Sequence, residues 1–384
     1  MYNVQEKIQA SLGNFTMEGR WFRYSSFVPR LYNWCQSLGF EAGSIMPSRA
    51  FCPDESQGYP VILMSKHFAA FPFNHGRVGG IMALDRHGPH AHHGKDLLIV
   101  HASHVGYNPE TQHFGTYRRG QTEDNSCSSS CGKIHGILDW YLDEYEFAKN
   151  NIFIDMRGHQ CCITIDNKYL STTCVNSLVL KLDKILEQRS NGEFIPLSSK
   201  STSRTFRTST EFYEAMREHF SSADGVMPIG NALLADYFVF HSDLVKDTDG
   251  SRQLEVNLIG VMPSIVTSYA PLLTAAQANT QAEFDRAHRS LSQEPAYQGR
   301  NLLYITGLNI DISPEKGQLF PLTKFVPWAA YVQLKTGESY VVEQDDLFDL
   351  LNEFSEENEK QISMDDAIHS MEDAEEIVLH LPQS

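Results

Sequence analysis

The sequence lacks both a long apolar run and an excess of positive charge. No stretch approaches the ~20 apolar residues of a membrane-spanning helix, and the first residues do not follow the basic-then-apolar order of a secretory signal. The 31 Lys and Arg residues stand against 48 Asp and Glu residues, which gives a formal net charge of −17. Such a chain is a poor non-specific binder of nucleic acid or anionic membranes. We therefore expect a cytoplasmic protein with no nucleic-acid or membrane partner.

Cysteine is sparse, and it is absent from the second half of the chain. The seven cysteines are an odd number, six lie between Cys35 and Cys162, and none follows Cys174. In a cytoplasmic protein such cysteines are typically reduced, buried or metal-bound rather than paired in disulfides. A region without cysteine cannot build a thiolate metal site, so such a site must lie in the first half.

The negative charge is concentrated near the C-terminus. Between Glu343 and Glu376 there are fourteen acidic residues and one basic residue, Lys360, so this segment carries −13 of the −17. Two interpretations stay open for this segment: a solvated helix face, which is the simpler, or a docking tail for a partner.

A chain of 384 residues with a hydrophobic fraction of 41% can form a folded core without disulfide or metal cross-links. The apolar run Leu97–His101 predicts a strand buried on both faces, and the spacing from Ile134 to Tyr145 predicts an amphipathic helix. The fold class is therefore α/β, a mixed sheet flanked by helices. The Ser-, Thr- and Arg-rich stretch 198–210 predicts a linker, so we divide the chain into a domain at 1–200 and an additional C-terminal α+β region at 201–384 with an acidic helical tail.

Several further elements are predicted from local patterns. The predicted strands are Ile45–Cys52, Cys161–Ile165, Asp236–Phe240, Leu254–Val261, Asn301–Ile305 and Trp328–Leu334. The predicted helices are Val28–Leu38, Cys174–Leu186, Gln277–Leu291 and Asp345–Phe354.

Three residues with metal-ligating side chains stand where an α/β protein places its site. Cys52 follows a predicted strand, His104 follows the strand ending at His101, and Cys131 opens a predicted helix. Two thiolates and one imidazole suit Zn²⁺ and leave a fourth position for water. Asp54 is close enough in sequence to accept a hydrogen bond from that water.

The same residues permit other chemistry. Cys52 could be a small buried hydrophobe. Cys131 at a helix N-terminus could be a nucleophile, with His104 and Asp54 completing a Cys-His-Asp triad. From the residues alone, a zinc site and a cysteine nucleophile are equally supported.

Five short motifs in a fixed order add a resemblance to a known family. The motifs are Cys52-Pro-Asp-Glu55, Phe71-Pro-Phe-Asn-His-Gly-Arg-Val-Gly79, Leu97-Leu-Ile-Val-His-Ala-Ser-His-Val-Gly106, Arg118-Arg-Gly-Gln121 and Ser129-Ser-Cys-Gly132. Together they resemble the limiting-CO₂-inducible B/C proteins (LCIB-like), the theta-class carbonic anhydrases, and cover about residues 40–150.

The resemblance implies a beta-carbonic-anhydrase-like fold in which Cys52, His104 and Cys131 ligate zinc and Asp54 contacts the zinc-bound solvent. The beta class pairs this Asp with an Arg two residues later, whereas this chain has Ser56 there.

Arg77 or Arg118 is expected to replace that arginine from a distance. The resemblance also implies a small apolar substrate pocket shaped by Phe73, Val105 and Gly106.

The resulting expectation is a zinc carbonic anhydrase, a lyase in which zinc-bound hydroxide hydrates CO₂ reversibly to bicarbonate. A histidine of the 87–93 loop would be the proton shuttle if one operates. The family implies a homodimer or a higher homo-oligomer. The alternatives are a catalytically inactive zinc-bearing protein of the same fold that binds bicarbonate or serves a structural role, and a hydrolase with Cys131 as nucleophile.

Overall fold

The structure is a computed structural model of the chain. It describes residues 15–84, 95–118, 127–157, 161–171, 176–220, 225–246, 249–315, 317–318 and 320–375.

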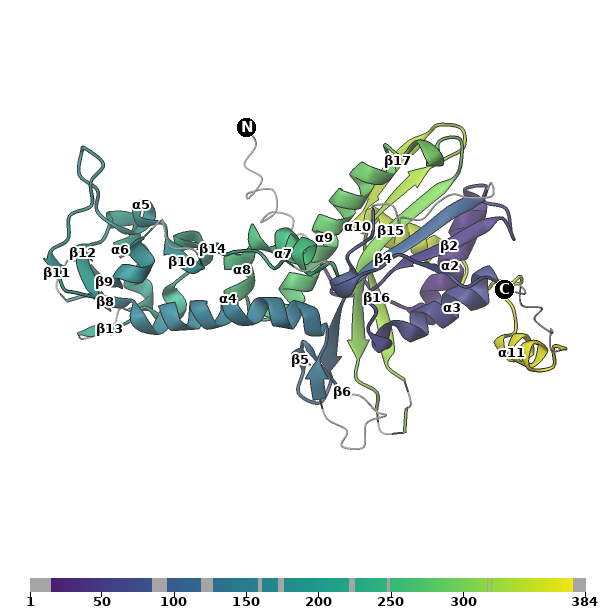
Figure 1. The fold of residues 1–384 in the computed structure, drawn as a ribbon, viewed down its shortest axis with the longest axis horizontal. Helices are drawn as coiled ribbons and strands as arrows, with labels where there is room; N and C mark the ends of the chain where they lie inside the picture. Colours follow the sequence, from purple (N-terminus) through teal and green to yellow (C-terminus); the bar gives the residue numbers. More distant parts are fainter. Residues whose placement is uncertain are drawn as a thin grey trace, which may run out of the picture.

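A large mixed sheet forms the core of one lobe (Figure 1). Its strand order is β1-β16-β15-β4-β2-β3, with β17 beside β16 and β5 beside β4. The strands β3, β2, β4 and β15 run parallel to one another, and the remaining pairings are antiparallel. The strands are β1 (Phe22–Arg23), β2 (Ile45–Ala50), β3 (Phe73–Asn74), β4 (Asp96–Asn108), β5 (His113–Phe114), β15 (Leu302–Ile312), β16 (Leu322–Gln333) and β17 (Ser339–Glu343).

Helices cover both faces of this sheet. One face packs against α2 (Tyr24–Ser37), α3 (Gly58–Phe68) and α10 (Gln344–Glu353), and the other packs against α9 (Pro271–Leu291). The central strand β4 is buried along nearly its whole length, as a strand with helices on both sides must be. The predicted α/β class, a mixed sheet flanked by helices, is confirmed.

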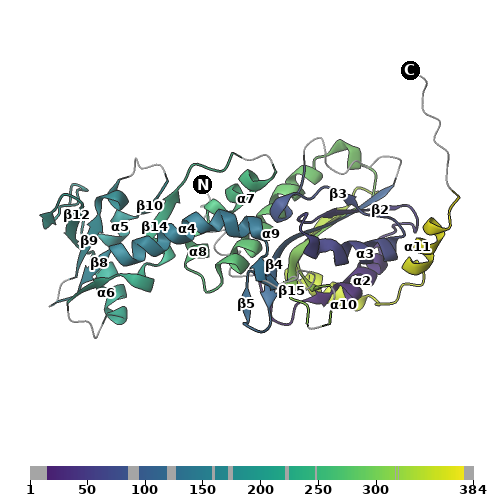
Figure 2. The same ribbon diagram turned by 60° about the horizontal axis from the view of Figure 1, so that its bottom comes forward.

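A second lobe lies at the far end of a long helix. Figures 1 and 2 show α4 (Gly132–Asn151) leading from the large sheet to a smaller antiparallel sheet. That sheet has the order β11 (Ser198–Ser199), β12 (Ser203–Arg207), β9 (Cys162–Asp166), β8 (Phe153–Asp155) and β13 (Val226–Pro228). Smaller pairs are β10 (Ser177–Leu180) with β14 (Phe238–His241), and β6 (Thr116–Arg118) with β7 (Cys127–Ser129).

Shorter helices complete the described chain. The α-helices are α5 (Leu182–Ile185), α6 (Thr210–His219), α7 (Ser251–Ile259), α8 (Met262–Val266) and α11 (Met364–Glu372). The 3₁₀ turns are η1 (Glu55–Gln57), η2 (Val78–Gly80), η4 (Asn167–Leu170), η5 (Gly230–Ala232), η6 (Ala235–Tyr237) and η7 (Pro295–Tyr297).

The large sheet contains strands from both sides of the domain boundary expected near residue 200. β15 and β16 belong to the predicted C-terminal region, yet β15 pairs with β4 in parallel from Leu302–Leu97 to Ile312–Tyr107. A parallel pairing needs a crossover connection, and here the whole second lobe and α9 serve as that crossover. The N- and C-terminal parts of the chain therefore share one sheet.

Three local predictions are wrong. Leu254–Val261 is not a strand, because Leu254 and Leu258 at helical spacing bury one face of α7. Within Cys174–Leu186, the described residues form β10 and the short α5, since the apolar run of β10 is buried throughout and such a run has no clear period. The predicted linker 198–210 contains β11 and β12, whose backbone is paired in the smaller sheet.

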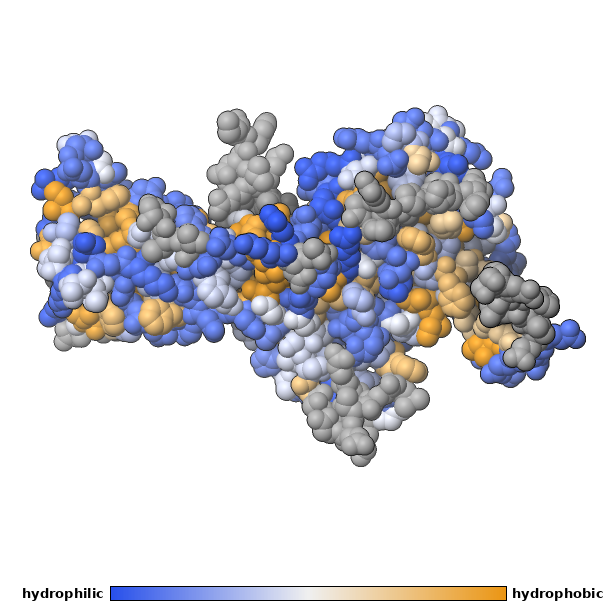
Figure 3. All heavy atoms as spheres, viewed as in Figure 1, coloured by the Kyte–Doolittle hydropathy of each residue, from blue (hydrophilic) through white to orange (hydrophobic). Residues whose placement is uncertain are grey.

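Among the described residues, no helix is both long and apolar enough to span a bilayer. Figure 3 agrees with this, because the face that it shows is mostly hydrophilic and its apolar atoms form separate small patches.

Candidate metal centre

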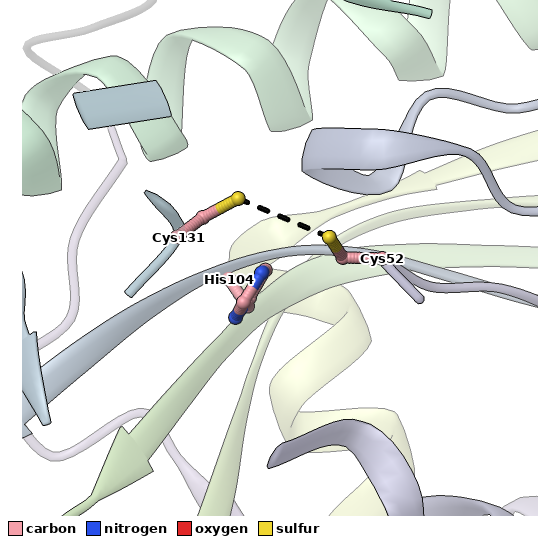
Figure 4. Close-up of side chains that lie close together, drawn as sticks. All are labelled: Cys52, His104 and Cys131. Carbon is pink, nitrogen blue, oxygen red and sulfur yellow. Dashed lines mark hydrogen bonds between the residues drawn. The ribbon is translucent and has the colours of Figure 1, made fainter. Parts of the chain in front are cut away.

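Three different elements bring Cys52, His104 and Cys131 together at the large sheet. Cys52 lies two residues beyond the end of β2, His104 lies within β4, and Cys131 is the residue that caps the N-terminus of α4. Their ligand atoms all lie within 4.8 Å of one another, and all three side chains are buried. In Figure 4 the two sulfur atoms point toward each other, with the imidazole of His104 beside them.

The residues present fit a zinc ion. The Sγ atoms of Cys52 and Cys131 are 3.9 Å apart, and two sulfurs on one tetrahedral zinc would be separated by about 3.8 Å, given Zn–S bonds of about 2.3 Å. Nε2 of His104 is buried, and among the residues that the structure describes it has no hydrogen-bond partner. A buried polar atom without a partner is costly, and a role as a metal ligand would account for it. Two thiols and an imidazole are also the donor types that zinc prefers.

The other ring nitrogen of His104 is held by a residue that the sequence analysis missed. Nδ1 of His104 lies 2.8 Å from Oδ2 of Asp311, and both side chains are fully buried. Asp311 comes from β15, where its backbone is paired with Gly106 of β4. An Asp inside an otherwise apolar strand was the available signal, because a fully buried carboxylate is rare unless it is paired.

A glycine-containing turn supports Cys52 from the other side. The backbone N–H of Gly79, in η2, donates to Sγ of Cys52 at 3.3 Å. Gly79 and Gly80 both adopt positive φ angles, of 67° and 81°. A side chain on Gly80 would place its Cβ 2.3 Å from the carbonyl oxygen of Ala102. The glycines therefore let this turn approach β4 and direct a backbone donor at the thiolate.

Hydrogen bonds, burial and neighbouring charges shift the pKa values of all three side chains. The hydrogen bond between the two sulfurs, with burial, raises the pKa of Cys52, and the same hydrogen bond lowers the pKa of Cys131. Burial acts to lower the pKa of His104, but the neighbouring Asp311 and Cys52 outweigh it and raise that pKa to about 10. A metal must displace the protons of these groups, so binding will weaken as the pH falls.

Asp54 lies at the start of η1, half-buried, where its Oδ1 accepts a hydrogen bond from the backbone N–H of Ser56 at 3.2 Å. The pKa of Cys131 is lowered mainly by its hydrogen bond to Cys52, and the negative charge of Asp54 is a smaller influence that opposes this lowering. The hydroxyl of Ser56 donates to Oδ2 of Asp311 at 2.8 Å, so Ser56 belongs to the His104 side of the site.

The two arginines differ in their surroundings. Arg77 is half-buried and directly precedes η2, and its backbone N–H donates to the carbonyl of Ile81 at 2.7 Å. The guanidinium of Arg118 forms an ion pair with Glu110 at 3.1 Å and donates to the carbonyl of Pro314. Their expected role beside Asp54 stays a prediction.

The expected pocket residues occupy different environments. Val105 is buried and belongs to the same hydrophobic cluster as Cys52 and Cys131. The N–H of Gly106 donates to the carbonyl of Ser130, the residue before Cys131, at 2.9 Å. Phe73 is 46% exposed, on the edge strand β3. Their contribution to a pocket stays a prediction. The histidines of the 87–93 loop and residues 119–121 lie outside the described residues.

If Cys131 acted as a nucleophile, its catalytic triad would differ from the predicted one. His104 is oriented by Asp311 rather than by Asp54, so a triad would consist of Cys131, His104 and Asp311. Such a triad gives no role to Cys52, whereas a metal uses both sulfurs and the unpartnered Nε2. The geometry favours a metal centre.

Comparison with known proteins finds similarity only at the level of solved structures. No protein-family model matches the chain, and no curated protein matches it. Its structure is similar to the crystal structure of PtLCIB4, a homolog of the limiting CO₂-inducible protein LCIB, with 12% identity and a TM-score of 0.49 over 88% of this chain and 99% of the other. It is also similar to the crystal structure of limiting CO₂-inducible protein LCIB, with 12% identity and a TM-score of 0.41 over 85% of this chain and 95% of the other.

Proposed function

We propose that Cys52, His104 and Cys131 hold a zinc ion and that the protein catalyses the reversible hydration of CO₂ to bicarbonate. The observation that carries the proposal is the convergence of two sulfurs and an imidazole nitrogen within 4.8 Å in a buried site. The order of the five motifs, which resembles that of theta-class carbonic anhydrases, supports the choice of reaction.

Zinc held by three protein ligands would lower the pKa of a bound water to about 7 and so supply a nucleophile at neutral pH. The protein's own groups would do the rest. Asp54 accepts a hydrogen bond that orients the attacking oxygen. Val105, Gly106 and Phe73 shape a small apolar space for CO₂, which is apolar and needs little recognition. Arg77 or Arg118 provides positive charge for the bicarbonate product.

A second candidate function is a zinc-bearing protein of this fold that binds bicarbonate or serves as a structural partner without turnover. Two observations favour it. Ser56 replaces the arginine that the beta class places two residues after its Asp, and its hydroxyl is directed at Asp311. The guanidinium of Arg118 is already engaged with Glu110 and Pro314.

Stopped-flow CO₂ hydration on metal-quantified protein tests the proposal. We expect about one zinc per chain and rapid hydration, both lost in Cys52→Ser and kept in the control Cys162→Ser, since Cys162 lies on β9 in the second lobe. Full zinc without hydration would establish the second candidate. Absence of zinc, with alkylation of Cys131 abolishing hydrolysis of a thioester, would establish the cysteine hydrolase instead.

We also propose that the protein acts as a homodimer or a higher homo-oligomer in the cytoplasm, as the resemblance implies. Light scattering coupled to size-exclusion chromatography checks the assembly. A monomeric mass at micromolar concentration would contradict it.

A further inference from the structure

We infer that Asp311 is a positioning residue for the metal centre, which fixes the ring of His104 so that Nε2 faces the two cysteines. The inference rests on the proposed metal site and deepens it. It assigns to the C-terminal part of the chain, which contains no cysteine, an indirect part in metal binding, through His104.

The first step is the set of groups that surround the carboxylate. Besides Nδ1 of His104, Asp311 receives the hydroxyl of Ser56 at 2.8 Å, the side-chain amide of Gln57 at 2.9 Å and 3.0 Å, and the hydroxyl of Thr323 at 3.1 Å. The carboxylate is fully buried. An ionised carboxylate accepts hydrogen bonds only, and each of these four neighbours can donate. The site therefore surrounds the carboxylate of Asp311 with four donor groups.

The second step shows that these donors are themselves held in place. The carbonyl oxygen of the Gln57 side chain accepts from Nδ2 of Asn309 at 2.7 Å, and Oδ1 of Asn309 accepts from the hydroxyl of Tyr24 at 2.7 Å. The amide of Gln57 must therefore turn its NH₂ group toward Asp311. This chain of hydrogen bonds links α2, η1 and β15 and leaves the carboxylate one orientation.

The third step concerns His104 itself. Because Asp311 accepts, Nδ1 must carry the proton, and the lone pair of the neutral ring then lies on Nε2. Among the described residues Nε2 has no hydrogen-bond partner, and because Nδ1 is held by Asp311, Nε2 is the ring nitrogen left for a metal that Cys52 and Cys131 share. Outer carboxylate partners of this kind fix the tautomer and raise the basicity of the ligand, and their loss typically costs 10–100-fold in metal affinity.

The test measures metal affinity rather than turnover. Asp311→Asn presents an amide that cannot accept from all four donors, so we expect zinc affinity in chelator competition to fall by about 10–100-fold. The control is Asp96→Asn at the opposite end of β4, where the carboxylate bonds the backbone and side chain of Asn301. This variant should bind zinc like the wild type even if it melts at a lower temperature.

A spectroscopic readout separates positioning from general structure. In the zinc-loaded protein, ¹⁵N-histidine correlation spectra should show His104 protonated at Nδ1, with the proton resonance displaced in Asp311→Asn and unchanged in Asp96→Asn. If Asp311→Asn does not fold, Ser56→Ala removes a single donor and should displace the same resonance. Wild-type affinity and an unchanged His104 resonance in the Asp311 and Ser56 variants would overturn the inference and leave the metal site standing. A wild-type protein that binds no zinc would overturn both.

Discussion

The sulfur atoms of Cys52 and Cys131 lie 3.9 Å apart although 79 residues separate the two cysteines in the sequence. Cys52 follows β2 and Cys131 precedes α4, so the large sheet and the N-terminus of α4 meet at this point. The two cysteines therefore come together only when β2 and α4 are in their folded positions. Changes to the metal should therefore be felt as changes in stability.

Removing the metal should destabilise the protein. A ligand that binds only the folded state at 100 times its Kd adds about 2.7 kcal/mol to the free energy of unfolding. We therefore expect a chelator to lower the Tm of the zinc-loaded protein and added zinc to restore it, as measured by calorimetry. In Cys52→Ser the chelator should have little effect. An equal drop in Tm for both proteins would show that the chelator acts elsewhere.

Asp54→Asn should retain zinc but lose activity. The change removes the carboxylate expected to orient the attacking oxygen without touching Cys52, His104 or Cys131, so kcat/KM for CO₂ hydration should fall by at least about 100-fold. The neighbouring exposed Glu55→Gln is the matched control and should leave kcat/KM unchanged. Loss of zinc from Asp54→Asn, measured by metal analysis, would contradict this separation of roles.

Gly80→Ala should be far more destabilising than Gly39→Ala. The two glycines share nearly the same φ, 81° and 83°, so both substitutions carry a strain cost of about 1–2 kcal/mol. Only at Gly80 does the added Cβ meet a backbone oxygen, that of Ala102 at 2.3 Å, while at Gly39 nothing lies within 4 Å. In urea unfolding, Gly80→Ala should therefore lose at least about 2 kcal/mol more than Gly39→Ala. Equal losses would contradict the close approach of η2 to β4.

Stability should fall between pH 7 and pH 5, and His101 should account for part of the loss. Burial lowers the pKa of His101 to about 4, below the ~6.5 of an unfolded chain. In that window the unfolded state binds more protons, so the free energy of unfolding falls as the pH falls, by about 2 kcal/mol for this residue at pH 5. Urea unfolding at both pH values should show a smaller fall in His101→Gln. An identical fall in the variant would exclude His101 as a source.

The sequence predicted the parts of the site that depend on local signals. Cys52 follows a short strand and stands before the turn signal Pro53-Asp54, and Cys131 precedes a long amphipathic helix, so both could be placed at the ends of elements. The apolar run containing Val100 likewise identified the central strand. His104 lies within β4 rather than beyond it, because the strand continues to Asn108.

The parts that depend on long-range pairing could not be predicted. Asp311 reaches His104 only because β15 joins β4 in parallel after the second lobe, and no local pattern fixes which strands become neighbours. The sequence of α7 predicts a strand because a short, mostly apolar segment can form either a buried strand or one side of a helix, and its pattern alone does not distinguish them. Tertiary packing, with Leu254 and Leu258 buried on one side, decides between them.

The account depends most directly on the ligands of the bound metal, which X-ray absorption spectroscopy at the zinc edge measures on the purified protein. It predicts two sulfur ligands at about 2.3 Å and lighter ligands at about 2.0–2.1 Å, including one imidazole. In Cys131→Ser, whatever zinc remains should show one sulfur. A zinc ion with no sulfur ligands in the wild type would contradict the assignment of Cys52, His104 and Cys131 as the metal centre.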